Sequence, residues 1–343
     1  MSPFHSIEAL HAACTTLPLP DRRAVSQIQA REAVLTKPAG SLGRLEELVE
    51  WFGAWRPLQV DQVDLCIFAG NHGVLAQNVS SWPASVTAAM VDNFMQQGAA
   101  INQLAKIAGA HLHVIPIGEL IPSADFTLHP ALSPEAFLAA VSTGYDAVPE
   151  HCDLLALGEM GVGNTTAAAA LAAALFGQDG SYWAGRGAGL DEAGLTRKAR
   201  VIDRALALHG RNHSPLDLTR IYGGWELAAL MGASLAARHR RIPVLLDGFV
   251  VTAAVAPLAL LDPTGLDHTR LAHQSQEQGH RQLAGFLGLD PLLDLQLRLG
   301  EGSGAALAIP LVRAALACHN GMASFSDVAI HNKSERIIIK RDD

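Results

Sequence analysis

Short apolar runs that end at or near glycine alternate with helical stretches along most of this 343-residue chain. The runs have the length and the Val, Ile and Leu content of strands buried on both faces: VDLCIFAG at 63–70, HLHVIPIG at 111–118, DLLALG at 153–158 and IPVLLDG at 242–248. Helical stretches follow them within 83–97, 99–108, 164–176, 191–208, 225–238 and 252–261. Strand followed by helix, repeated several times, predicts an α/β fold with a parallel sheet.

The composition indicates a compact protein with a core of small side chains. Hydrophobic residues make up 49% of the chain, charged residues only 17% and aromatic residues 5%. A disordered chain would carry more charge, so disorder is excluded for most of the sequence. With 31 glycines and long alanine-rich stretches, the interior must rely on close approach between backbones.

The net charge bears on which partners the protein can bind, and the spacing of the cysteines bears on its cellular compartment. The 25 basic and 33 acidic residues give a net charge of −8 without any run of like charges, so nucleic acid is not expected as a partner. The four cysteines lie far apart, which indicates neither a disulfide framework nor a zinc site and fits a reducing cytoplasm. The N-terminus lacks a leader pattern, and the longest uncharged apolar run, at 167–176, has half the length of a membrane span. We therefore expect a cytoplasmic protein without membrane segments.

An anion site is predicted where the run at 153–158 leads into GEMGVGNTT. Gly161 and Gly163 allow the backbone to approach a ligand. The helix that begins near Asn164 and Thr165 would offer its free N–H groups and the positive end of its dipole. No Gly-Lys-Ser/Thr ending follows, so a monophosphate is favoured over a nucleoside triphosphate. The alternative is an ordinary strand-to-helix turn capped by Asn164.

A second glycine cluster, GRGAG, spaces Gly185, Gly187 and Gly189 two residues apart, and Lys198 follows on the next helix. Two such loops could hold one phosphorylated sugar, with Lys198 supplying a point charge to the phosphate. The alternative is that Lys198 is a solvated residue on a helix face, as most lysines are.

Glu301 stands between Gly300 and Gly302 in LRLGEGSGAALA, just before a helix. Flanking glycines permit close approach of a ligand, which is how a loop presents a catalytic base at the mouth of a sheet. Such a base needs apolar surroundings that raise its pKa toward neutrality. The alternative is a turn glutamate exposed to water.

Two further patterns allow more than one interpretation. Val86, Met90 and Phe94 lie four residues apart, which is typical of helical core and also of the wall of a flat apolar pocket.

The histidines and the glutamate of AHQSQEQGH (His273, Glu277 and His280) would share one face of a helix, which suits a metal-dependent hydrolase, although no His-Glu-x-x-His motif occurs. A third class is a non-catalytic protein that stores a base or a phosphorylated riboside.

In their order along the chain, the motifs resemble those of the nicotinate-nucleotide:dimethylbenzimidazole phosphoribosyltransferases of cobalamin nucleotide-loop assembly. The resemblance rests on KPAGSLGRLE, AGNHGV, SWPASVT, QGAAIN, GEMGVGNTT, the GRG cluster, YGGWELAALMGA, PVLLDGF, HQSQEQGH, LRLGEGSGAALA and MASF, from Lys37 to Phe325. Two positions depart from the family pattern. Ala188 stands where we expect threonine, and Ala272 where serine usually precedes the histidine. These two departures bear on the details of contact with the ribose or the phosphate and not on the family resemblance.

For the fold, the resemblance implies a Rossmann-like parallel sheet of about six strands with helices on both faces. This sheet would belong to a large catalytic domain at 61–320, and a small helical domain would combine residues 1–60 with 321–343. Family members are homodimers that need no metal and no cofactor.

For the function, the resemblance implies a glycosyltransferase that moves the phosphoribosyl group of nicotinate mononucleotide to 5,6-dimethylbenzimidazole. The products would be nicotinate and α-ribazole 5′-phosphate, with inversion at the anomeric carbon and Glu301 as general base. The ribose phosphate would contact Glu159, Gly161, Gly163, Asn164, Thr165, Gly187, Gly189 and Lys198. The benzimidazole would lie near Ser81, Met90 and Leu299.

Overall fold

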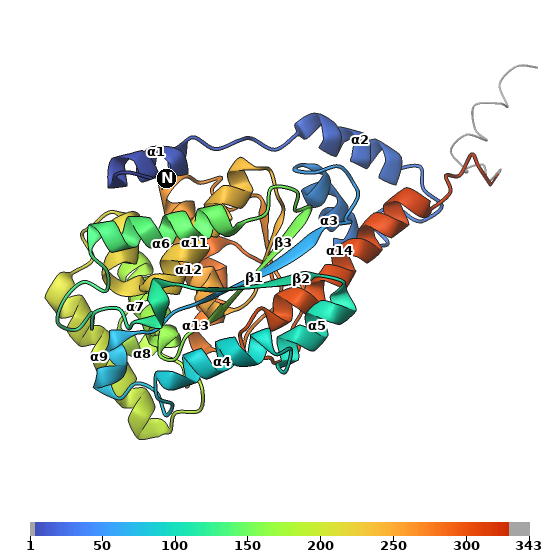
Figure 1. Ribbon diagram of the computed structural model, residues 1–343. Helices are drawn as coiled ribbons and strands as arrows, with labels where there is room; N and C mark the ends of the chain where they lie inside the picture. Colours follow the sequence, from blue (N-terminus) through green and yellow to red (C-terminus); the bar gives the residue numbers. More distant parts are fainter. Residues whose placement is uncertain (1–3, 329–343) are drawn as a thin grey trace, which may run out of the picture. The chain divides into compact units, whose positions relative to one another are not determined.

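The computed structural model describes residues 4–328, in which five parallel strands form one sheet. In spatial order the strands are β2 (His111–Pro116), β1 (Val63–Ala69), β3 (Leu154–Met160), β4 (Val244–Leu246) and β5 (Thr269–Leu271). The central strands β1 and β3 (Figure 1) pair from Val63 opposite Leu154 to Ala69 opposite Met160. Every residue of β1 is buried, as the apolar run predicts.

The predicted α/β class with a parallel sheet is confirmed, and four of the strands coincide with the four apolar runs. The described sheet has five strands rather than about six. The strand β5 was missed in the sequence, because Thr269-Arg270-Leu271 is only three residues long and contains no apolar run. Its pairing with β4 shows that tertiary context, not local propensity, makes this strand.

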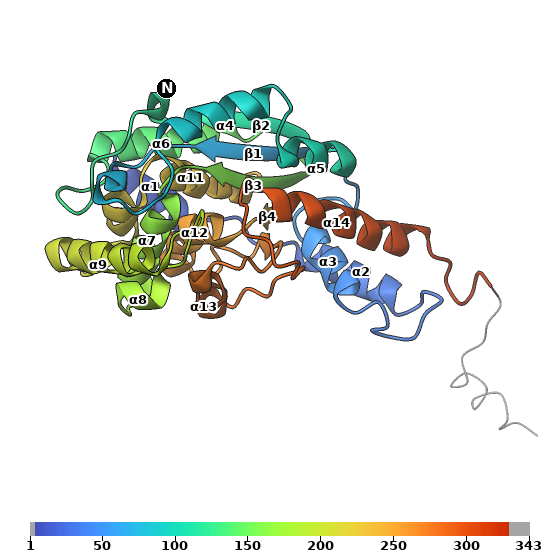
Figure 2. The same cartoon turned by 90° about the horizontal axis from the view of Figure 1, so that it is seen from below.

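Helices connect the strands on both faces of the sheet. α4 (Ser85–Met95) and α5 (Ala100–Ala108) lead from β1 to β2, α6 (Pro134–Ala147) leads from β2 to β3, and α11 (Trp225–His239) precedes β4. Figures 1 and 2 show α4 and α5 on one face and α6 with α11 on the other. The winding therefore reverses between β1 and β3, and open α/β sheets bind ligands at such a reversal.

Glycines let α6 and α11 approach closely. A Cβ atom on Gly144 would lie 1.8 Å from the carbonyl oxygen of Ala229, and one on Gly232 would lie 2.0 Å from that of Val141. Since α11 is buried from Glu226 to Arg238, larger side chains at these glycines would force the two helices apart. This contact explains part of the high glycine and alanine content.

The strands and these helices belong to the larger of two compact units, which comprises residues 4–18 and 61–308. Its other helices are α1 (Ile7–Thr15), η1 (Gly73–Gln77), η2 (Gly118–Leu120), α7 (Asn164–Phe176), α8 (Gly180–Trp183), α9 (Glu192–His209), α10 (Pro215–Leu218), η3 (Thr219–Gly223), α12 (Phe249–Leu261), α13 (Gln278–Leu287) and the first part of α14 (Ser303–Gly321). Among residues 4–328, no helix combines the length and the apolar character that a membrane crossing requires.

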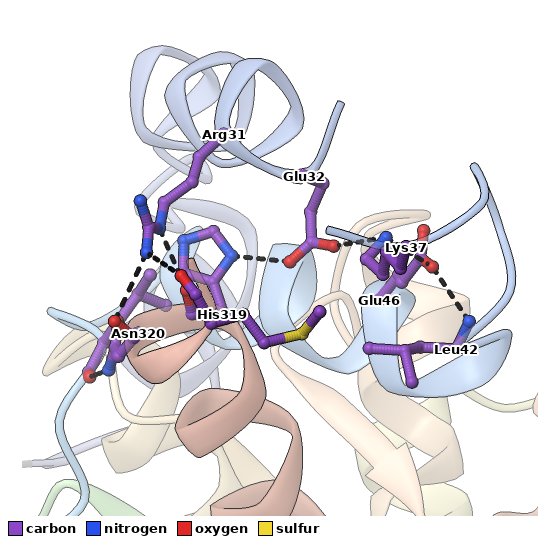
Figure 3. A network of polar contacts seen from close by, with 9 residues as sticks. Arg31, Glu32, Lys37, Leu42, Glu46, His319 and Asn320 are labelled. Carbon is purple, nitrogen blue, oxygen red and sulfur yellow. Dashed lines mark hydrogen bonds and ion pairs between the residues drawn. The ribbon is translucent and has the colours of Figure 1, made fainter. Parts of the chain in front are cut away.

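The smaller unit comprises residues 19–60 and 309–328, with α2 (Arg22–Glu32), α3 (Arg44–Gly53) and the end of α14. Its interior contains a network of charges (Figure 3): Lys37 Nζ lies 2.8 Å from Glu32 Oε2 and from Glu46 Oε1, and Glu32 Oε1 lies 2.6 Å from His319 Nδ1. Lys37 is the partner that both carboxylates share, so removing it would leave two largely buried negative charges close together. Lys37 and Glu46, which belong to the KPAGSLGRLE motif, therefore have a structural role in this unit. The predicted domain limits at 60 and 320 stay a prediction, and residues 329–343 lie outside the described part.

Candidate active site

A cavity of about 540 Å³ lies at the carboxyl edge of the sheet, within the larger unit. The end of β3 and the segment after it contribute residues 159–165 to its wall, and the segments that follow β4 and β5 contribute residues 248–250 and three residues of 273–277. Parts of 79–90 and of 186–190, together with residues 298–301, complete the wall. Because the carboxyl ends of parallel strands meet at one edge, loops far apart in the sequence come together here.

Most of the predicted site residues line this cavity. They are Ser81, Met90, Glu159, Gly161, Gly163, Asn164, Thr165, Gly187, Leu299 and Glu301. Gly189 and Lys198 are not part of the wall. Of the two departures from the family pattern, Ala188 lines the cavity and Ala272 is fully buried.

The first turn of α7 has no side-chain cap. Gly163 is the N-cap residue, with a φ of +95°, and no side-chain cap bond is formed there. The alternative of a turn capped by Asn164 is wrong, because Asn164 is the first helical residue and its side-chain amide donates to Glu159. Gly161 permits close packing, since a Cβ atom there would lie 2.6 Å from Glu226 Oε1. The amides of Asn164 and Thr166 already donate to the carbonyl oxygens of Gly161 at 3.2 Å and of Gly163 at 2.9 Å. The start of α7 therefore offers an anion in the cavity chiefly the amide of Thr165 and the positive end of the helix dipole.

Lys198 of α9 lies behind this wall. Its Nζ donates to Thr165 Oγ1 at 2.8 Å and to the carbonyl oxygen of Gly185 at 3.1 Å. The side chain is fully buried, so the interpretation as a solvated surface residue is wrong. Burial lowers the pKa of Lys198 to about 8, against the opposing effect of the Glu277 charge. Lys198 thus remains mostly charged at neutral pH and adds positive charge next to the start of α7.

Glu301 occupies the centre of a strained turn. Its φ is +63°, between Gly300 at +80° and Gly302 at +79°, and the left-handed region costs a non-glycine residue about 1–2 kcal/mol. Only 6% of the residue is exposed, so the interpretation as a glutamate exposed to water is wrong. Burial, and secondly the charge of Asp247, raise the pKa of Glu301 to about 7. The carboxyl group can therefore take up and release a proton near neutral pH.

A second carboxyl group, that of Glu159, lies at the end of β3 in the same wall. Burial, followed by the charges of Glu226 and Asp247, raises the pKa of Glu159 to about 8. A Cβ atom on Gly300 would lie 2.4 Å from Glu159 Oε1. Glu159 thus contacts both the start of α7, through Asn164, and the turn that carries Glu301.

Apolar side chains form another side of the cavity. Trp82, Val86, Met90 and Leu299 all line it, and Trp82 and Leu299 keep 53% and 55% of their surface exposed. Along α4, Val86 and Met90 belong to the wall whereas Phe94 is buried in the interior. The interpretation as a pocket wall is therefore correct for Val86 and Met90, and the interpretation as helical core is correct for Phe94.

The proposed metal-binding face does not form. α13 begins only at Gln278, so His273, Glu277 and His280 do not lie on one helix. Burial lowers the pKa of His280 to about 3, and its Nδ1 accepts a backbone amide at 2.9 Å. Within residues 4–328 there is no cluster of three His, Cys, Asp or Glu side chains arranged to hold a metal. The basis of the hydrolase hypothesis is therefore wrong.

Two buried acidic residues close to the cavity were missed in the sequence. Asp247 directly follows β4 and is 1% exposed. Glu226 is fully buried, and its Oε1 lies 2.6 Å from His72 Nε2. An acidic residue immediately after a predicted strand, as in IPVLLDG, was the available signal for Asp247. Glu226 follows no strand, and no local pattern indicates its position.

The chain matches known proteins over nearly its whole length. A family model with the description "Phosphoribosyltransferase" matches residues 17–330. Curated relatives include the nicotinate-nucleotide–dimethylbenzimidazole phosphoribosyltransferases of Mesorhizobium japonicum, 55% identical over 96% of this chain and 100% of the relative, and of Novosphingobium aromaticivorans, 50% identical over 96% and 99%. The crystal structure of CobT from Thermus thermophilus is 39% identical, with a TM-score of 0.85 over 90% of this chain and 99% of that chain. The chain therefore belongs to the nicotinate-nucleotide–dimethylbenzimidazole phosphoribosyltransferase family.

Proposed function

We propose that the protein transfers the phosphoribosyl group of nicotinate mononucleotide to 5,6-dimethylbenzimidazole, with Glu301 as general base. The reaction releases nicotinate and forms α-ribazole 5′-phosphate, a precursor of the lower ligand of cobalamin. The observation that carries the proposal is one cavity that contains both an uncapped helix start and a buried carboxyl group whose pKa is about 7. The relatives that are named for this reaction support it.

The donor phosphate fits the start of α7. Residues 163–165 line the cavity at this point, and the helix dipole favours an anion there. Lys198, one hydrogen bond behind Thr165, adds a positive charge. Gly161 and Gly187 let their loops pack against Glu226 and Thr165, since a Cβ atom there would lie 2.6 Å from Glu226 Oε1 and 2.9 Å from Thr165 Oγ1. The glycines thus keep both loops close to the proposed phosphate site.

The acceptor base fits the apolar side of the cavity, near Met90 and Leu299, where Ser81 offers a hydroxyl group. A flat apolar ring is selected mainly by shape. Related benzimidazoles or purines are therefore expected to react with modest discrimination, about 10- to 200-fold for each misplaced methylene-sized group.

The chemistry needs a base more than an acid. The pyridinium nitrogen of the donor already carries positive charge, so the C1′–N bond breaks with its electron pair moving to that nitrogen, and no proton is required. One nitrogen of the acceptor attacks C1′ from the opposite face, and the other nitrogen gives its proton to Glu301. A single displacement inverts the anomeric carbon and requires no covalent carboxylate intermediate.

The family resemblance also leads us to propose that the protein works as a homodimer without a metal or a cofactor. The widely spaced cysteines lead us to propose the cytoplasm as its compartment.

The test is to incubate the purified, chelator-treated protein with both substrates and to follow the products by chromatography. We expect nicotinate and α-ribazole 5′-phosphate in equal amounts without added metal. A reaction without the acceptor is the control, because nicotinate released there would indicate hydrolysis instead of transfer. Binding of both compounds without release of nicotinate would overturn the proposal in favour of a storage protein.

A further inference from the structure

Asp247 closes the first turn of α14 from a neighbouring part of the sheet. The residue directly follows β4 and is 1% exposed. Its Oδ1 accepts from the amides of Gly304 at 2.8 Å and Ala305 at 3.1 Å, and its Oδ2 accepts from the amide of Gly302 at 3.1 Å. These are donors that a helix start cannot satisfy within itself, and a carboxylate there also complements the helix dipole.

The same contacts fix the backbone on the carboxyl side of Glu301. The amide of Gly302 belongs to the peptide bond that joins it to Glu301, so Asp247 holds the peptide that follows the proposed base. The backbone of β3 supports the turn from another side, because a Cβ atom on Gly158 would lie 2.6 Å from the nitrogen of Gly302. A left-handed glutamate persists only where its surroundings impose that conformation, and these contacts impose it.

Asp247 also contributes charge to the surroundings of Glu301. Its negative charge is the second cause, after burial, of the raised pKa of Glu301. The other titratable and charged residues that line the cavity with Glu301 are Glu159, Arg186, His273, Glu277 and Arg298. His273 Nε2 lies 3.3 Å from Asp247 Oδ1, so this histidine contacts the carboxylate as well.

We propose that Asp247 is a positioning residue for the transfer reaction, which fixes the turn of Glu301 through three backbone amides and places a negative charge behind the base. The inference rests on the function proposed above. It assigns a role to a residue that does not line the cavity and that acts through Glu301.

The first test compares the pH dependence of kcat/KM for the wild type and for Asp247→Asn. Asparagine keeps the size and one acceptor oxygen but removes the charge, so Glu301 would hold its proton less tightly. Because only deprotonated Glu301 accepts a proton, the acid limb should move to lower pH by roughly one unit, a ten-fold change in proton affinity. Both proteins use the same substrates, so titration of the substrates cancels. An unmoved acid limb, whatever the rate, would overturn the proposal.

Two further variants separate charge from position. Asp247→Glu keeps the charge but displaces the carboxylate by one methylene, so kcat should fall at least about ten-fold while the acid limb stays near that of the wild type. Wild-type kcat in this variant would contradict the positioning role. Asp64→Asn is the matched control, because Asp64 is also a buried carboxyl group, 7% exposed, but lies at the amino end of β1 and contacts His113. It should leave the limb unmoved.

A direct titration keeps the proposal testable if the transfer reaction is not found. Carbon-13 NMR of labelled glutamate carboxyl groups, with the Glu301 signal assigned by its loss in Glu301→Gln, measures the pKa of Glu301 without substrates. A lower pKa of Glu301 in Asp247→Asn would support the role of Asp247 even where the proposed function fails. Equal pKa values in both proteins would overturn that role even where the reaction occurs.

Discussion

Two helices begin at the edge of the same cavity, and their first turns are completed in different ways. α7 begins after Gly163 without a side-chain cap, whereas the first amides of α14 are bound by the carboxylate of Asp247. At α7 an anionic ligand can complete the helix start, and at α14 the protein supplies the anion itself. A helix N-terminus is thus a ligand site only where the chain has not already filled it.

This difference predicts that the two turns contribute to different steps of the reaction. The start of α7, with Lys198 behind it, should determine affinity for the phosphate of the donor. The turn before α14, which carries Glu301, should determine turnover. Substitutions on the two sides can therefore be told apart by whether they change KM or kcat.

Glu301→Gln should have the largest effect. Glutamine cannot accept the proton of the acceptor base, so we expect kcat to fall by about 10²–10⁴, or about 3–5 kcal/mol of activation free energy. Steady-state kinetics with both substrates measures this, with the exposed Glu47→Gln on α3 as a control that should retain activity. Full activity of Glu301→Gln would remove Glu301 from its role.

Lys198→Met should mainly weaken binding of the donor. Methionine has a similar length but no charge. The loss of a positive charge behind the phosphate, worth about 1.5–3 kcal/mol at an effective dielectric constant of about 20, corresponds to a KM for nicotinate mononucleotide raised roughly 10- to 100-fold. We expect kcat to change much less. Lys106→Met, at an exposed position on α5, is the matched control. A reduced kcat with an unchanged KM would place Lys198 with the chemical step. It would contradict the prediction that the start of α7 determines affinity for the donor.

Glu159, which contacts both turns, should make the free energy of unfolding depend on pH. The pKa of Glu159 is raised to about 8 in the folded protein, mainly by burial, so the folded state binds this proton more tightly than the unfolded state does. Its contribution to stability is therefore lost as the pH rises from the unfolded value of 4.5 toward 8. Glu159→Gln cannot lose a proton, and its free energy of unfolding should exceed that of the wild type by roughly 1–2 kcal/mol at the alkaline end. Urea unfolding at both ends of this range measures the difference, and an equal difference at both would contradict the prediction.

The fold could be predicted from the sequence because its main strands are continuous apolar runs that end at turns. VDLCIFAG and DLLALG became β1 and β3 within one or two residues of their limits. The strand β5 could not be predicted in this way, since a three-residue strand with a central arginine has no pattern of its own and forms only by pairing with β4.

The candidate site could be predicted where its residues lie on local glycine-rich turns, but their contacts could not. The sequence places Glu301 in a turn, whereas its burial depends on segments distant in the chain. Burial of Lys198 likewise depends on the packing of α9, and the amide of Asn164 contacts Glu159 instead of capping the helix. Local patterns identify turns and caps, and only the folded chain decides which polar groups satisfy one another.

The smallest expected effect is the gain in thermal stability when inorganic phosphate binds. This gain should distinguish the start of α7 from the start of α14. An anion that binds only the folded state raises the free energy of unfolding by RT ln(1 + [L]/Kd), about 1.4 kcal/mol at ten times Kd and less below that concentration. We expect phosphate to stabilise the wild type and Glu301→Gln equally in thermal unfolding, and to stabilise Lys198→Met less, with chloride at equal ionic strength as the control. Equal stabilisation of all three proteins would show that phosphate does not bind at the start of α7. Loss of the effect in Glu301→Gln alone would place the anion at the turn before α14, where Asp247 already occupies the amides, and would break the comparison between the two helices.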